Sequence, residues 1–98
     1  METVIGLGEA GCSVAKAFGA YPQYDVLKID VGLIGDRRCF NYPQCITHQD
    51  YETVDVDLTQ FFSDVSGDVL FIVTGSGAIS GATLNILHQL ESRGCNLY

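Results

Sequence analysis

The chain has 98 residues with a net charge of −7, and 47% of its residues are hydrophobic. A chain of this length forms one small domain, and its hydrophobic fraction excludes intrinsic disorder. The acidic balance, 12 acidic against five basic side chains, argues against nucleic-acid binding, which needs a basic face. No apolar run approaches the roughly 20 residues that span a bilayer, and the N-terminus has no signal-peptide pattern. We therefore predict one cytoplasmic domain over residues 1–98, with no nucleic-acid or membrane partner.

The first half of the chain predicts two strands with a helix between them. Residues 3–7 and 24–29 are short apolar runs typical of strands, and Asp30 closes the second. Apolar residues at helical spacing from Gly11 onward predict a helix that ends near Gly19 and Pro22. Its expected buried face consists of Val14, Ala17, Phe18 and Tyr21. Residues 36–56 predict a long loop with a short edge strand near residues 53–56.

The second half predicts a helix, a buried strand, a second helix and the start of another strand. The first helix begins at the cap residue Asp57 and ends at Gly67. Its expected buried residues are Leu58, Phe61, Phe62 and Val65. Residues 68–74 include five successive apolar residues, which indicates a strand buried on both faces, as in a parallel sheet. The last helix ends at Arg93 and Gly94, and its apolar side consists of Ile79, Thr83, Ile86, Leu87 and Leu90.

This alternation of strands and helices predicts an α/β fold. Because crossovers between parallel strands are right-handed, the units build a three-layer, doubly wound, mostly parallel sheet with helices on both faces. Residues 95–98 resemble the beginning of a further strand. We therefore expect a Rossmann-like nucleotide-binding domain that is incomplete at its C-terminus and is the N-terminal part of a longer protein.

The reactive side chains form no catalytic or metal-binding pattern. The four cysteines are expected to be free thiols, as is usual inside cells. Cys39, Cys45 and His48 lie close in sequence but lack zinc-finger spacing. Cys12 is interpreted as a small packing residue, and the serines have no visible His and acid partners. We therefore predict neither catalytic residues nor a metal site.

Two glycine-rich turns, residues 6–11 and 75–81, each follow an apolar strand and open a helix. Such turns let backbone N–H groups approach an anion, and the following helix directs its positive end to the same point. Together they predict one phosphate site at the carboxyl ends of the strands. Gly6, Gly8 and Gly11 also match the dinucleotide fingerprint, and Asp30 lies near the offset of the acid that binds a ribose hydroxyl. NAD binding is therefore one hypothesis.

The residues within both turns resemble the tubulin/FtsZ family. The run Gly8-Glu9-Ala10-Gly11-Cys12-Ser13 is similar to the tubulin loop Gly-Gln-(Ala/Cys)-Gly-Asn-Gln. Val4-Ile5-Gly6-Leu7-Gly8 resembles the FtsZ strand Val-Ile-Gly-Val-Gly, and Leu27-Lys28-Ile29-Asp30 resembles its second strand, Ile-Ala-Ile-Asn. The run Gly77-Ala78-Ile79-Ser80-Gly81-Ala82-Thr83 is similar to Gly-Gly-Gly-Thr-Gly-(Ser/Thr)-Gly, with Ser80 in place of the central Thr.

This resemblance implies a guanine nucleotide, GTP or GDP with Mg²⁺, whose phosphates lie between the two turns. The residues that it implies as ligands are Gly8, Glu9, Ala10, Gly11, Cys12, Gly75, Gly77, Ser80 and Gly81. Glu9 replaces a tubulin Gln, and its carboxylate would repel a polyphosphate unless it held Mg²⁺ or were protonated. The resemblance also implies a homo-oligomer or filament built through regions beyond Tyr98, so this chain alone is not expected to hydrolyse GTP quickly.

Two alternatives stay open beside guanine-nucleotide binding. In the first, the chain is an NAD-binding Rossmann-type domain in which Asp30 binds the ribose. In the second, the glycines only make tight strand-to-helix turns and pack helix against sheet. The chain would then be a non-catalytic structural or partner-binding domain without a cofactor.

Overall fold

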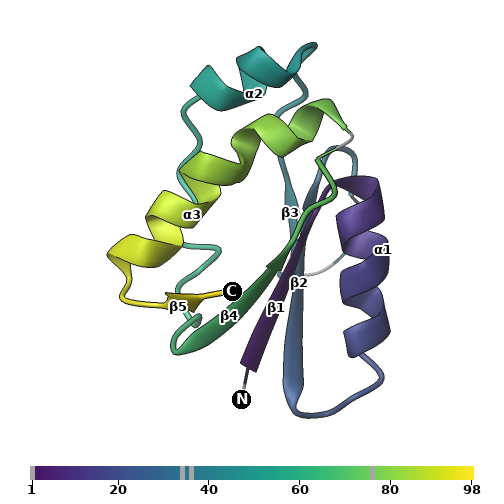
Figure 1. Ribbon diagram of the computed structural model, residues 1–98, viewed down its shortest axis with the longest axis vertical. Helices are drawn as coiled ribbons and strands as arrows, with labels where there is room; N and C mark the ends of the chain where they lie inside the picture. Colours follow the sequence, from purple (N-terminus) through teal and green to yellow (C-terminus); the bar gives the residue numbers. More distant parts are fainter. Residues whose placement is uncertain (1, 34, 36, 76) are drawn as a thin grey trace.

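The computed structural model describes residues 2–33, 35, 37–75 and 77–98. Within them, five parallel strands form one sheet in the order β3-β2-β1-β4-β5 (Figure 1). The strands are β1 (Glu2–Leu7), β2 (Tyr24–Asp30), β3 (Cys39–Asn41), β4 (Asp68–Ile72) and β5 (Asn96–Leu97). The predicted α/β fold with a parallel sheet is confirmed.

Helices cover both faces of this sheet. Helix α1 (Gly8–Phe18) lies on one face, and α2 (His48–Thr53), the 3₁₀ turn η1 (Ala78–Ala82) and α3 (Thr83–Ser92) lie on the other (Figure 1). The chain adds β2 and β3 on one side of β1 and then crosses back to place β4 and β5 on the other side. The strand order therefore reverses between β1 and β4, and in open α/β sheets this is the point where ligands bind.

The hydrophobic core lies on the α3 face of the sheet. Ile5, Ile29 and Val69 point into it from the strands, and Ile86 and Leu90 are its fully buried α3 residues. On the opposite face, α1 lies directly on the backbone of β1. A Cβ atom on Gly6 would lie 2.8 Å from the Cβ of Ala15 and 2.5 Å from the carbonyl oxygen of Gly11.

This close approach overturns the predicted buried face of the first helix. The residues of α1 that are buried are small: Gly8, Gly11, Cys12 and Ala15. Val14 is 48% exposed, Tyr21 is 55% exposed, Ala17 is exposed and Phe18 is half-buried. Larger side chains do not fit between α1 and β1, so Val14 points to solvent, while Phe18 packs edge-on against Tyr24 at the start of β2, with ring centroids 5.1 Å apart.

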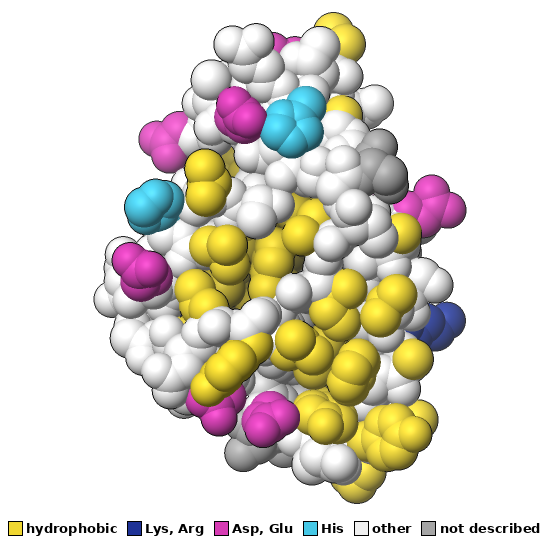
Figure 2. All heavy atoms as spheres, viewed as in Figure 1, with side chains coloured by type: hydrophobic (Ala, Val, Ile, Leu, Met, Phe, Trp, Pro, Cys, Tyr) yellow, Lys and Arg dark blue, Asp and Glu magenta, His cyan; other side chains and the backbone are white. Residues whose placement is uncertain are grey.

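The prediction that β4 is buried on both faces is also wrong. Val69 is fully buried, whereas residues 70–73 are only partly buried. Figure 2, in the orientation of Figure 1, shows hydrophobic side chains gathered on the surface across the centre and lower right of the molecule. Leu70 and Ile72 on one face of the strand and Phe71 and Val73 on the other are therefore partly buried alike.

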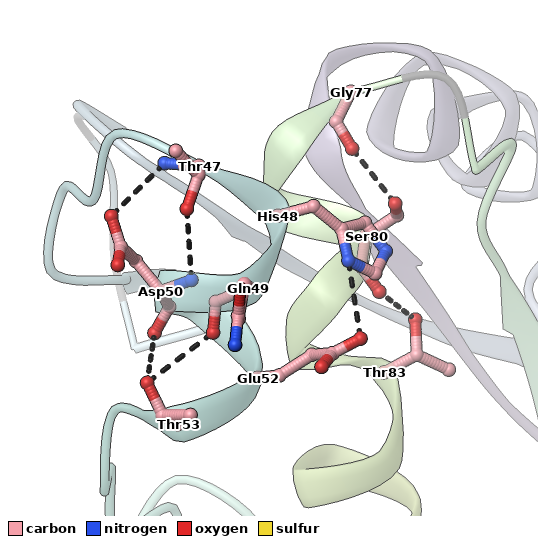
Figure 3. Close-up of polar contacts among 9 residues, drawn as sticks. All are labelled: Thr47, His48, Gln49, Asp50, Glu52, Thr53, Gly77, Ser80 and Thr83. Carbon is pink, nitrogen blue, oxygen red and sulfur yellow. Dashed lines mark hydrogen bonds and ion pairs between the residues drawn. The ribbon is translucent and has the colours of Figure 1, made fainter.

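Residues 36–56 are more ordered than a long loop. They contain β3 and α2, while the edge strand predicted near residues 53–56 is absent from this described segment; Asp36 lies outside the described residues. Thr47 and Asp50 start α2 with a capping box, in which Thr47 Oγ1 accepts from Asp50 N–H and Asp50 Oδ2 accepts from Thr47 N–H (Figure 3). The spacing of Thr47 and Asp50 was a helix-start signal that the sequence interpretation missed.

Residues 57–65 bury three of the four expected side chains, with Phe61 half-buried, and do not form the expected helix. Leu58, Phe62 and Val65 are buried, but the backbone follows turns rather than a continuous helix. Some of its backbone groups bond within the segment, as Phe62 N–H does to the Leu58 carbonyl at 2.9 Å, and others bond to side chains of α3. Gln89 accepts from Leu58 N–H at 2.7 Å and donates to the Val56 carbonyl at 2.8 Å. Because a buried backbone group needs a partner of some kind, Gln89 satisfies two backbone groups at the start of this segment.

Two other α3 side chains extend this hydrogen-bonded contact. Arg93 donates to the carbonyl oxygens of Ser63 and Val65, at 2.9 and 3.2 Å from Nη2. Asn85 donates to the Val56 carbonyl and to the Tyr42 hydroxyl, each at 3.3 Å. Asn85, Gln89 and Arg93 are four residues apart, so they lie along one side of the helix. We call these three residues the α3 clamp.

Candidate functional site

A pocket of about 390 Å³ opens at the carboxyl ends of β1 and β4. The first glycine turn and the helix after it contribute Leu7, Gly8, Glu9, Ala10 and Ser13 to its lining. The second turn and the two residues before it contribute Val73, Thr74, Gly75, Gly77, Ile79 and Ser80. Its volume lies within the range of about 300–1,000 Å³ that is usual for small-molecule sites. The two turns, more than sixty residues apart in the sequence, therefore form the walls of one cavity at the point where the strand order reverses.

The first wall is the N-terminus of α1. Gly8 has a φ of +78°, a conformation that favours glycine, and it turns the chain sharply from β1 into the helix. No side-chain hydrogen bond caps this helix end at Leu7. The N–H groups of the first helical turn have no intrahelical partner, and Gly8, Glu9 and Ala10 line the pocket. This wall can therefore donate backbone hydrogen bonds to a ligand.

The second wall is an open loop followed by a short 3₁₀ turn. Gly75 has a φ of +78°, and no atom lies within 4 Å of where a Cβ on Gly75 or Gly77 would be. The Ser80 hydroxyl donates to the Gly77 carbonyl at 2.8 Å, as Figure 3 shows, and so holds the loop closed onto η1. Ser76, in the same turn, lies outside the described residues. The Ser80 proton is engaged in this turn, while its oxygen is able to accept a further bond.

Six of the ten predicted ligand residues line the pocket: Gly8, Glu9, Ala10, Gly75, Gly77 and Ser80. Gly11 and Gly81 do not, because the structure uses both for close packing. A Cβ on Gly11 would lie 2.5 Å from the Ile72 carbonyl oxygen, and one on Gly81 would overlap the His48 carbonyl oxygen. These two glycines bring α1 against β4 and η1 against α2.

Cys12 and Asp30 also lie outside the pocket lining. The Cys12 thiol donates to the Gly6 carbonyl at 3.4 Å, and burial raises its pKa above the ordinary range, so it is a packing group rather than a reactive thiolate. Asp30 follows Ile29, which pairs with Leu7, so it lies one strand away from the Gly8 turn. Its carboxylate accepts from Val31 N–H at 2.8 Å.

The electrostatics of the pocket are unusual for an anion site. Glu9 is the only charged side chain among the described lining residues, and no Lys or Arg is among them. The hydroxyls of Ser13, Thr74 and Ser80 are the other polar side-chain groups. Ile79 narrows the site, since its Cγ2 would lie 3.1 Å from a Cβ on Gly8. A negatively charged ligand would therefore depend on backbone N–H groups, hydroxyls and a bound cation.

Sequence reasoning missed five lining residues: Leu7, Ser13, Val73, Thr74 and Ile79. Two of them carried a usable signal. Thr74 directly follows the apolar run of β4, and Ser13 lies four residues after Glu9 on the same side of α1. Ile79 had no such signal, because its contact with the first turn arises only when the two turns meet.

Two further findings concern metals and membranes. No three His, Cys, Asp or Glu residues of the described chain lie close enough together to hold a metal ion, and Cys39, Cys45 and His48 form no such group. All four cysteines are free. Among the described helices, none has the length and apolar character needed to cross a bilayer.

Comparisons with known proteins identify no relative. No family model, curated protein or solved structure matches this chain.

Proposed function

We propose that the pocket between the two glycine turns binds a nucleotide through its phosphates, without fast hydrolysis by this chain alone. One observation carries the proposal: two glycine turns, on the strands that flank the reversal of strand order, line a single pocket with the N-terminus of α1. Backbone N–H groups at a helix N-terminus are a general anion-binding arrangement. The open space around Gly75 and Gly77 lets a phosphate approach the second wall.

The resemblance of both turns to the tubulin/FtsZ family favours GTP or GDP with Mg²⁺ as the ligand. Mg²⁺ would offset the repulsion between the Glu9 carboxylate and the phosphates, because it can bind carboxylate and phosphate oxygens at the same time. In the absence of Mg²⁺, the Glu9 carboxylate repels the nucleotide. Binding is therefore expected to require Mg²⁺, and Glu9→Gln is expected to reduce that requirement.

NAD is the second candidate, and the position of Asp30 favours it. Asp30 ends the strand next to β1, where an acid binds the ribose of a dinucleotide in Rossmann folds. Asp30→Asn separates the two ligands. It is expected to weaken NAD binding at least about tenfold while leaving GTP unaffected, because the amide oxygen preserves the local bond to Val31 but not the charge.

The decisive experiment is titration calorimetry with GTP, GDP, ATP and NAD, each with and without Mg²⁺, on the native chain and on Gly77→Val. Gly77 lines the pocket, has a φ of −97° that any residue adopts, and has no neighbour within 4 Å of its Cβ position. The variant is therefore expected to fold normally and to lose binding. Gly11→Val is unsuitable, since it would collide with the Ile72 backbone.

The matched control is Ala20→Val, at an exposed position past the opposite end of α1, which should bind as the native chain does. Absence of heat with all four ligands contradicts the proposal and favours a structural role for the turns. If Gly77→Val and the native chain bind the ligand with equal affinity, the ligand binds outside this pocket.

A further inference from the structure

Lys28 occupies an unusual position for a lysine, inside the parallel sheet. It lies on β2 and pairs with Gly6 of β1 on one side and with Cys39 of β3 on the other. Gly6 faces α1, and residues paired across neighbouring strands share a face, so Lys28 lies on the α1 face. Its side chain is partly buried and has no hydrogen-bond or carboxylate partner among the described residues. A cation partly removed from water without a partner costs free energy, which an anionic ligand would offset.

Lys28 lines a hollow of about 190 Å³ beside the C-terminal end of α1. Lys16 and Gly19 contribute to it from the last turn and the C-cap of α1, and the rest of its described lining comes from β2 and the start of β3. The described residues that line it are Lys16, Gly19, Val26, Lys28, Arg38 and Cys39. This described lining contains no Asp or Glu. The fold thus brings basic side chains from three separate segments to one small cavity, which we call the basic hollow.

The basic hollow concentrates the few positive charges of an acidic chain. Its lining includes three of the five Lys and Arg residues of the sequence, although the net charge of the chain is −7. On the face that Figure 2 shows, acidic side chains are widely spread, whereas basic side chains appear only at the edge beside α1. A local excess of one charge in a concave site attracts ligands of the opposite charge.

Two lysines supply the uncompensated charge of the basic hollow. Arg38 forms an ion pair with Asp25, so its guanidinium charge is already compensated. Neither Lys16 nor Lys28 has an acidic partner within the described part of the chain. Lys16 lies in the last turn of α1, where a cation also stabilises the helix end. Lys28 has no such second role, so its position carries the argument for a ligand.

We propose that the basic hollow binds a phosphate dianion, either inorganic phosphate or the phosphoryl group of a small ester. A phosphate monoester carries a charge of about −1.5 to −2 at pH 7, which two ammonium groups balance and a single carboxylate does not supply. Lysine binds phosphate as a point charge with three N–H donors. The volume of the hollow lies below the roughly 300 Å³ at which ordinary small-molecule sites begin. A compact anion therefore fits it better than a whole nucleotide.

This proposal does not depend on nucleotide binding between the glycine turns. The basic hollow shares no described lining residue with that pocket, and the two lie at opposite ends of α1. They also differ in chemistry, since the pocket offers backbone N–H groups and hydroxyls where the hollow offers charged side chains. Inorganic phosphate is small enough for both, so the amides that respond to it distinguish the two sites.

The test is a titration of the ¹⁵N-labelled chain with inorganic phosphate and, separately, with glycerol 3-phosphate, at an ionic strength held constant with chloride. Saturable shifts are expected for the amides of Gly19, Val26, Lys28 and Cys39, which line the hollow. Tighter binding of glycerol 3-phosphate would identify an ester as the ligand, and tighter binding of phosphate would identify the free ion. Saturable shifts at the glycine turns alone would overturn the proposal and leave the nucleotide proposal standing.

Three substitutions that each remove one positive charge locate the binding. Lys28→Met is expected to weaken phosphate at least about tenfold, the loss expected for one hydrogen bond to a charged group, and Lys16→Met at least about fivefold. Arg37→Met is the matched control, because Arg37 is exposed and lies outside this lining, and its affinity should stay within about twofold. Lys16 is exposed on α1, so its substitution tests the proposal even where Lys28→Met disturbs folding. Gly77→Val should leave this binding unchanged.

The Cys39 thiol gives a second measurement, because it is partly buried in the same lining. Saturating phosphate is expected to slow its alkylation by iodoacetamide at least about threefold, with Cys45, which lies outside the hollow, as the internal control. An unchanged alkylation rate at Cys39 would contradict the proposal. Equal phosphate affinity of Lys16→Met, Lys28→Met and the native chain would overturn it, as would shifts that chloride alone reproduces.

Discussion

The two faces of the sheet are packed by opposite means. On the α1 face, a helix lies directly on the backbone of β1 and β4, and the contact residues are glycine, alanine and cysteine. On the α3 face, large side chains fill the space, and the α3 clamp bonds an irregular segment to a helix. Substitutions that add atoms should therefore destabilise the α1 face, whereas substitutions that remove side-chain atoms should destabilise the α3 face.

This difference affects the candidate site. The close contact of α1 with β4 fixes the N-terminus of α1 beside the second glycine turn, so the pocket depends on the α1 face. The α3 face supplies most of the buried apolar surface and hence most of the folding free energy. The substitutions that destabilise the two faces should consequently differ, both in whether they add or remove atoms and in the folding free energy that they cost.

The largest effect is expected from Gly6→Ala, which adds one methyl group to the α1 face. Its Cβ would lie within 2.8 Å of three atoms, two of them in the α1 backbone, so the helix must move off the sheet. We expect a loss of more than about 4 kcal/mol, most of the stability of a small domain. Circular dichroism should show loss of the cooperative melt. Gly77→Ala is the control with open space, and a native melt for both variants would refute the close contact.

On the α3 face, Phe62→Ala should cost about 3–5 kcal/mol, because it removes a fully buried ring and leaves a cavity. Phe18→Ala is the matched substitution on α1, where the half-buried ring packs edge-on against Tyr24, and should cost less, about 1–2 kcal/mol. Urea unfolding measures both. Equal losses would mean that the two faces do not differ as described.

The α3 clamp should contribute less to the free energy of unfolding than a core side chain does, but more than a surface contact does. Gln89→Ala leaves Leu58 N–H and the Val56 carbonyl without their partner and should cost about 1–3 kcal/mol. Gln89→Glu should also destabilise the chain, because a carboxylate cannot donate to Val56. Gln49→Ala, at an exposed position of α2, is the control for urea unfolding. A Gln89→Glu variant as stable as the native chain would argue against the donated bond.

The smallest effect concerns pH and the α1 face. Burial raises the pKa of the Cys12 thiol, so the unfolded chain loses its proton before the folded chain does. The stability from the protonated thiol is fully present below the ordinary thiol pKa of about 8.5 and is lost as pH rises through the raised folded value. Urea unfolding from pH 7 to 10.5 should show a steeper loss for the native chain than for Cys12→Ala. If the native chain and Cys12→Ala lose stability in parallel as the pH rises, the Cys12 thiol is exposed to water in the folded chain.

Several features of the fold follow from local sequence and could be predicted. Strands β1, β2 and β4 are short apolar runs, and the turns after β1 and β4 need glycine where φ is positive, at Gly8 and Gly75. The apolar pattern of residues 57–65 also predicted three buried side chains correctly, those of Leu58, Phe62 and Val65. Each of these properties depends on neighbouring residues, which the sequence displays directly.

By itself, the sequence determined the parallel α/β alternation and the positions of the two glycine turns, because strand burial and positive φ leave local patterns. Only the tertiary structure decided which glycines line the pocket, since Gly11 and Gly81 face other backbone segments while Gly75 and Gly77 face open space. It also decided which partners the two ends of residues 57–65 find, because Gln89 and Arg93 lie 31 and 28 residues along the chain from Leu58 and Val65. Contacts between distant segments leave no periodic pattern in the sequence, so these contacts can be identified only in the packed tertiary structure.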